Sequence, residues 1–263
     1  MNHIRTLIEK EWAEIFKNRM VLMSFILMPL LFTGIPLVML GTMGTTSISG
    51  SAVESGLPAG AMALCPGLSG IECLQITVLS QFMVFFMLLP MILPAMVAAY
   101  SIVGEKTTRS LEPLLATPIT TIELLVGKAL SAALPAIAAT WLSYGIFIVG
   151  TFILKISPAV QAYVFNPIWL VGILALGTVL AIISVIFAIF VSSQVNDPRA
   201  AEQISSVLVL PVMLLFVGQM IGKVVISLGF MLTTTAICLL LAMALFYLGI
   251  RVFDRENILT KWK

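Results

Sequence analysis

The sequence predicts an all-α integral membrane protein with six transmembrane helices, and three observations support this fold class. Of the 263 residues, 60% are hydrophobic and only 10% are charged, whereas a soluble domain carries about 25% charged residues. The mean hydropathy is +1.13, so the chain has too little polar surface to stay dissolved in water. Six stretches are apolar over the roughly 20 residues that a helix needs to cross a bilayer.

The predicted spans form a single transmembrane domain over residues 1–263. They are expected at about residues 20–40, 76–103, 124–154, 168–191, 204–221 and 224–250. An outer loop at 41–75 separates the first two spans within 20–103, and spans three to six fill 124–250. Only Gly222 and Lys223 separate the last two spans. This stretch is therefore either a tight hairpin or contains a half-helix that re-enters the membrane.

The distribution of basic residues predicts the orientation of the chain. In a six-span arrangement, twelve of the fourteen Lys and Arg residues fall on one side, and only Lys155 and Lys223 fall on the other. Basic residues mark the cytoplasmic side of membrane proteins. We therefore expect a multi-pass protein of the cell membrane (inner or plasma membrane), with both termini and the tail at 251–263 in the cytoplasm.

The first nineteen residues predict an amphipathic helix that lies along the membrane surface. Apolar side chains recur there at helical spacing on one face: Ile4, Leu7, Ile8, Trp12, Ile15 and Phe16. Glu11 interrupts this face. An ordinary solvated helix before the first span is the alternative.

The residues that enzymes and ion-coupled carriers use are missing from the sequence. The single histidine, His3, lies near the N-terminus, and no Cys-x-x-Cys pair or phosphate-binding Gly-x-x-x-x-Gly-Lys-[Ser/Thr] motif occurs. The spans carry essentially no ionisable residue near their centres, where such residues are usually functional. We expect no catalytic residue, no metal and no cofactor in this chain. The net charge of +2 gives no indication of a nucleic-acid partner.

Two further groups of residues give open predictions. Cys65 and Cys73 fall in the predicted outer loop, where a disulfide can persist, although two free thiols fit the sequence equally well. Met83, Phe86 and Met87 lie on the second span. Methionine-rich surfaces adapt to varied apolar ligands, so these residues are candidates to line the path of a lipid-like or amphipathic substrate. Ordinary packing in a core or against lipid would use the same residue types.

Residues 104–123 form the most charged internal segment, yet Leu111, Leu114 and Leu115 recur in it at helical spacing. A short helix with a charged face and a leucine face is typical of a docking element. The alternative is an ordinary cytoplasmic loop. After the break at Thr117 and Pro118, the spacing of Thr120 and Glu123 predicts a capping box that starts the third span.

This segment resembles the signature of type-2 permeases of ATP-binding cassette (ABC) exporters. The resemblance rests on Gly-Glu-Lys at 104–106, Ser-Leu-Glu-Pro-Leu-Leu-Ala-Thr-Pro at 110–118 and Glu-Leu-Leu-Val-Gly-Lys at 123–128. Arg109 and Ser110 stand where many members have Gly-Thr. The segment 196–203 is similar to the second cytoplasmic loop of the family, in the branch associated with sodium or drug efflux.

The resemblance implies that the loop after the second span is a coupling helix that inserts into a separate ATPase subunit. The implied contacts are Glu105, Arg109, Leu111, Glu112, Leu114 and Leu115. It further implies that ATP and Mg²⁺ are bound by the ATPase, and that the permease works with a second copy or a homologue in membrane lipid. Two alternatives are a non-ABC carrier and an ABC membrane subunit that transmits force without moving solute.

Overall fold

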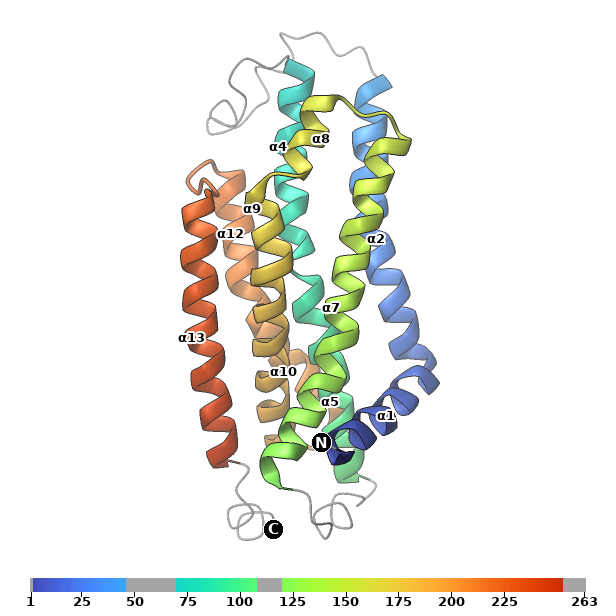
Figure 1. Cartoon of the computed structure of the whole chain (residues 1–263), viewed down its shortest axis with the longest axis vertical. Helices are drawn as coiled ribbons and strands as arrows, with labels where there is room; N and C mark the ends of the chain where they lie inside the picture. Colours follow the sequence, from blue (N-terminus) through green and yellow to red (C-terminus); the bar gives the residue numbers. More distant parts are fainter. Residues whose placement is uncertain (1, 46–69, 108–119, 253–263) are drawn as a thin grey trace.

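The computed structural model of the chain describes residues 2–45, 70–107 and 120–252. Over these ranges all regular secondary structure is helical, and six helical segments are long and apolar enough to cross a membrane. The helices run roughly side by side as one elongated bundle (Figure 1). The predicted all-α membrane fold with six spans is therefore confirmed.

Five long helices make the amino-terminal half of the described structure. They are α1 (Asn2–Lys17), α2 (Arg19–Thr45), α4 (Gly70–Phe86), α5 (Leu89–Thr107) and α7 (Thr121–Ile153). Helix α1 lies obliquely across one end of the bundle, whereas α2 and α7 run along its length (Figure 1). Helices α4 and α5 follow one another and together form the second span.

Shorter helical pieces make the fourth and fifth spans, and one long helix makes the sixth. The fourth span joins α8 (Pro158–Val164), α9 (Pro167–Leu170), the π-helix η2 (Val171–Leu176) and α10 (Gly177–Gln194). The fifth span joins α11 (Pro198–Ser205), the 3₁₀-helix η3 (Ser206–Val209) and α12 (Leu210–Met220). The sixth is α13 (Leu228–Val252).

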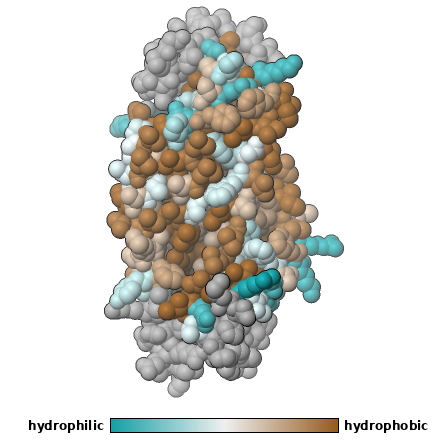
Figure 2. Space-filling view, in the orientation of Figure 1, coloured by the Kyte–Doolittle hydropathy of each residue, from teal (hydrophilic) through white to brown (hydrophobic). Residues whose placement is uncertain are grey.

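The core of the bundle is formed by the second and fourth spans. Most of their residues are buried, whereas most residues of the first, fifth and sixth spans are not. Figure 2 shows one face of the bundle, which is largely apolar over its middle and has hydrophilic residues near its two ends. A single chain thus exposes apolar surface over the middle of the bundle, as a protein immersed in a bilayer requires.

Two helices continue into the predicted outer loop. Helix α2 extends to Thr45 and α4 begins at Gly70, so both reach beyond the bounds expected from hydropathy. Polar side chains at these ends have partners: Ser157 Oγ donates to Glu72 Oε1 at 2.5 Å, and Gln75 Nε2 donates to the Leu40 carbonyl at 3.3 Å. Because their polar groups are paired, the helix ends continue past the apolar stretch that marks the span.

The segment at 196–203 is mostly helical, although the sequence suggested a loop there. Asp197 caps α11 by accepting a hydrogen bond from the Arg199 amide at 2.9 Å. The connection between the fifth and sixth spans is a hairpin, one of the two predicted alternatives, with no helix at residues 221–227. Gly222 adopts φ 75°, and the amides of Lys223 and Val224 both donate to the Gly218 carbonyl.

Two irregular turns lie against each other in the core. Helix α4 ends at Phe86, four residues before Pro90, whose ring excludes the Phe86 carbonyl from regular helical bonding. The π-helical turn η2 packs at the same level, since a Cβ on Gly172 would lie 2.7 Å from Met87 Cε. A Cβ at this position would have to displace the end of the Met87 side chain, so glycine lets the second and fourth spans pack here without moving it.

Candidate functional site

The helices that flank the predicted docking segment meet at one end of the bundle, here called the terminal end. Helix α1 lies there, α5 and α13 finish there, and α7 starts there (Figure 1). Residues 108–119, which connect α5 to α7, are outside the described ranges. The predicted contacts Arg109, Leu111, Glu112, Leu114 and Leu115 fall in this segment and remain predictions. Glu105 lies in the last turn of α5, and its contact likewise remains a prediction.

The capping box at the start of α7 is confirmed. Thr120 Oγ1 accepts a hydrogen bond from the Glu123 amide at 3.2 Å, and Glu123 Oε2 accepts one from the Thr120 amide at 3.0 Å. Such reciprocal bonds satisfy amides that a helix start otherwise leaves free. The third span therefore has a defined first turn directly after the predicted docking segment.

Helix α1 packs closely on the first turns of α7 because Gly127 has no side chain. A Cβ at Gly127 would lie 2.6 Å from Leu7 Cδ2, closer than two carbon atoms can approach. Leu7 is buried by this contact. One turn further along, Trp12 Nε1 donates to the Ser131 carbonyl at 3.1 Å. The two helices therefore contact each other through apolar packing and a hydrogen bond.

A buried ion pair joins the same two helices. Lys128 Nζ donates to Glu11 Oε1 at 2.9 Å, and the side chains are 5% and 2% exposed. Lys10 Nζ also approaches Glu11 Oε1, at 3.9 Å. An ion pair out of water is retained only when its partners are well placed, and removing one partner is costly. The two charges compensate each other inside the interface between α1 and α7, and removing either one would leave the other buried without it.

The spacing of residues along the sequence does not predict this pair. By spacing alone, Glu11 is an interruption of an apolar face, and Lys128 is one of the basic residues on the predicted cytoplasmic side. The signal was nevertheless present, because a carboxylate on an apolar helix face and a lysine inside a span each require a compensating partner. We call the group formed by Leu7, Glu11, Trp12, Gly127, Lys128 and Ser131 the α1–α7 contact.

Helix α11 packs on the last turns of α5 at the terminal end. Ala201 is fully buried with Ala99 and Val103 of α5 and with Val191 of α10. Small side chains allow the helices to approach closely. The segment that resembles the second cytoplasmic loop therefore contacts the helix that leads into the docking segment.

The predicted substrate-path residues lie in the core of the chain. Met83, Phe86 and Met87 are buried in the large apolar cluster, where the Phe86 ring packs against Phe147 at a centroid distance of 5.5 Å. In this conformation they have the packing of core residues. Their role in lining a path remains a prediction.

The cysteines lie in two different environments. Cys73 is disulfide-bonded, and Cys238 in α13 is a free thiol. Cys65 lies outside the described residues, so its pairing with Cys73 remains a prediction.

Comparison with known proteins identifies the family. The sequence-family model described as ABC-2 family transporter protein matches residues 5–229, from α1 to the start of α13. A search of curated proteins gave no match. The match covers well over half of the chain. It includes the α1–α7 contact, the predicted docking segment and the first five spans. The chain therefore belongs to the ABC-2 family of transporter proteins.

Proposed function

We propose that this chain is the permease subunit of an ABC exporter that moves a hydrophobic or amphipathic substrate across the cell membrane. The observation that supports this most directly is the family match over residues 5–229. Members of the family normally pair with ABC ATPase subunits. Binding and hydrolysis of ATP with Mg²⁺ then take place on the partner, since this sequence has no phosphate-binding loop.

The family match argues against the non-ABC carrier. Such a carrier needs an ionisable residue inside the membrane to couple transport to an ion, and the spans have essentially none near their centres. Within the ABC-2 family, the resemblance of 196–203 to the sodium or drug efflux branch suggests an exporter.

The α1–α7 contact supports a route for transmitting force from the ATPase. The ATPase binds the docking segment through Leu111, Leu114 and Leu115, with Glu105, Arg109 and Glu112 at the edge of the contact. A movement of this segment displaces the first turns of α7. Helix α1 follows, because the buried Glu11–Lys128 pair and the Leu7–Gly127 packing join it to α7.

Helix α1 in turn continues almost directly into α2. The Asn18 amide donates to the Glu14 carbonyl at 3.2 Å, and the Leu22 amide donates to the Asn18 carbonyl at 3.0 Å. The backbone bonding thus passes from α1 to the first span through a single residue. A displacement of α7 reaches α2 through this junction.

Two permease chains and two ATPase subunits form the working transporter in this proposal. The first, fifth and sixth spans leave much apolar surface uncovered by the chain itself. A second copy or a homologue covers part of this surface, and membrane lipid covers the rest. Both termini and the docking segment face the cytoplasm, where ATP is available.

Reconstitution with an ABC ATPase tests the proposal. The permease and an ATPase encoded next to it are purified as a complex and placed in vesicles. Candidate amphipathic substrates are then tested for ATP-dependent accumulation inside inverted vesicles. We expect both stimulated ATP hydrolysis and substrate movement, and an ATPase variant unable to hydrolyse ATP serves as the control. Failure to bind any such ATPase would refute the ABC function, while stimulated hydrolysis without solute movement would favour a force-transmitting subunit.

A further inference from the structure

Four hydrogen-bonding side chains meet between the second, fourth and fifth spans, in the half of the bundle away from the terminal end (Figure 1). They are Ser80 of α4, Tyr163 of α8, Trp169 of α9 and Gln219 of α12, here called the polar cluster. Gln219 Nε2 donates to Ser80 Oγ at 3.0 Å, and the Tyr163 hydroxyl approaches both Ser80 and Trp169. The Tyr163 and Trp169 rings pack edge to face, with centroids 6.1 Å apart.

Two atoms of the polar cluster are enclosed without a hydrogen bond. Among the described residues, neither Trp169 Nε1 nor Gln219 Oε1 has a partner. The Trp169 side chain is 1% exposed, so its N–H does not reach the surface of the bundle. A buried polar group left unpaired costs about 1–3 kcal/mol, and native proteins rarely contain one. The cluster therefore offers one donor and one acceptor to a further group.

Ser80 fixes the direction of the Gln219 amide. The Ser80 hydroxyl donates its single proton to the Thr77 carbonyl at 2.7 Å, so toward Gln219 its oxygen can only accept. The amide nitrogen of Gln219 must then face Ser80, since the reversed amide would place two acceptors against each other. The unpaired atom of Gln219 is therefore its oxygen, an acceptor, whereas the unpaired atom of Trp169 is a donor.

The surroundings of the polar cluster favour an uncharged group. None of its four side chains is charged, and Trp169 and Tyr163 belong to the large apolar cluster of the core. A charged group would lack a compensating charge there. A hydroxyl is the smallest uncharged group that both accepts from an N–H and donates to a carbonyl oxygen. Ser80 precedes Met83 by one turn of α4, so the polar cluster adjoins the residues predicted to line a substrate path.

We propose that the polar cluster binds hydroxyl groups, which accept a hydrogen bond from Trp169 Nε1 and donate one to Gln219 Oε1. Two sources share this chemistry: resident water and the polar end of an amphipathic alcohol. Water meets the requirement because buried waters pair with two to four polar groups that otherwise lack partners. The second source rests on the proposed function, since it makes the polar cluster a recognition site for a hydroxyl of the substrate.

Nuclear magnetic resonance of the permease without any ATPase tests the proposal. The full chain is labelled with ¹⁵N-tryptophan and placed in lipid nanodiscs, and the indole signal of Trp169 is identified by its loss in Trp169→Phe. A hydrogen-bonded indole proton resonates downfield of an unbonded one. The Trp12 indole, which donates to the Ser131 carbonyl at 3.1 Å, gives the bonded reference.

Two arms of the experiment distinguish the sources. Resident water gives a downfield Trp169 signal without any additive, together with magnetisation transfer from water. An alcohol as the occupant gives a signal that moves downfield only when 1-dodecanol is added. Dodecyl methyl ether accepts a hydrogen bond but cannot donate to Gln219. About tenfold more ether should therefore be needed for the same shift, equivalent to about 1.4 kcal/mol.

Gln219→Leu removes the acceptor and should abolish the downfield position of the Trp169 signal, or weaken the response to 1-dodecanol about tenfold. Gln219→Met, with a side chain of similar length, is used if the Leu variant does not fold. Gln161→Leu provides a matched control. Gln161 lies in α8, donates to the Thr151 carbonyl at 3.4 Å and is not part of the polar cluster, so the Trp169 signal should not change.

Two results would overturn the inference. The first is an unbonded Trp169 signal both without additive and with 1-dodecanol. The second is a downfield signal that is lost in Tyr163→Phe but unchanged in Gln219→Leu, because the indole would then donate to Tyr163 directly. Neither result bears on the ABC function, since no ATPase takes part in the measurement.

Discussion

Removing the Glu11 carboxylate should release α1 from α7. Glu11→Ala leaves the 5%-exposed Lys128 side chain without the carboxylate that lies 2.9 Å away. Breaking a buried ion pair by removing one partner costs about 3–5 kcal/mol. At 1.4 kcal/mol per factor of ten, the fraction of molecules with α1 detached should rise by a factor of about one hundred to several thousand.

A cysteine at Leu7 measures this fraction. Leu7 is 5% exposed within the α1–α7 contact, so a thiol there reacts with a maleimide only when α1 detaches. In a background without the native cysteines, the labelling rate follows the detached population. The rate should therefore increase at least about one-hundredfold in Glu11→Ala. The exchanged variant, Glu11→Lys with Lys128→Glu, should recover most of the protection because the pair is restored with opposite polarity.

Glu9→Ala provides a matched control on the same helix. Glu9 pairs with Arg5 at 2.9 Å, but the two side chains are 62% and 83% exposed. A pair so exposed contributes about 0–1 kcal/mol, so the labelling rate should change little. Equal rates in Glu11→Ala and Glu9→Ala would show that the buried pair does not hold α1. The proposed transmission through α1 would then lose its physical basis.

Three further predictions concern the docking segment, the energy source and the topology. Changing Leu114 and Leu115 together to Asp should abolish co-purification with the ATPase while leaving membrane yield unchanged, because unpaired charge cannot be desolvated cheaply in an apolar contact. Glu112→Ala should be milder, and full ATPase binding by the double variant would reduce the segment to a connector. The purified permease alone should not hydrolyse ATP, and turnover in a preparation free of other ATPases would contradict this. Cysteines at positions 109 and 199 should be labelled only from the cytoplasm, whereas labelling from outside intact cells would refute the topology.

The number of spans could be predicted because the membrane makes that property local. Within hydrocarbon each backbone amide must be bonded inside its own helix, so a sufficiently long apolar stretch determines a span. The capping box at Thr120 and Glu123 is local for the same reason, since its partners are three residues apart and both bonds are present. The family signature was also readable in the sequence, and the match over residues 5–229 confirms it at the level of the ABC-2 family.

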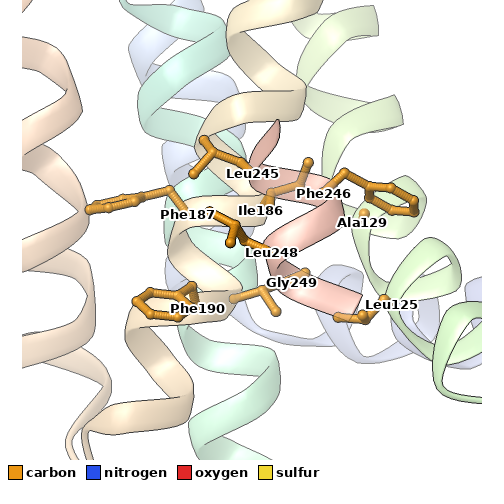
Figure 3. Close-up of a pocket in the computed structure, with 10 residues that line it drawn as sticks. Leu125, Ala129, Ile186, Phe187, Phe190, Leu245, Phe246, Leu248 and Gly249 are labelled. Carbon is orange, nitrogen blue, oxygen red and sulfur yellow. The ribbon is translucent and has the colours of Figure 1, made fainter. Parts of the chain in front are cut away.

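Helix ends and the partners of charged residues were decided by the tertiary structure. Hydropathy ended the first span near residue 40, whereas the helix continues to Thr45. By spacing, Glu11 only interrupts an apolar face, whereas its partner Lys128 lies 117 residues away on another helix. The apolar pocket drawn in Figure 3 is lined by residues of α7, α10 and α13 and likewise forms only where these three helices meet. These features depend on packing and charge compensation between segments distant in the chain, which the spacing of residues within one helix does not encode.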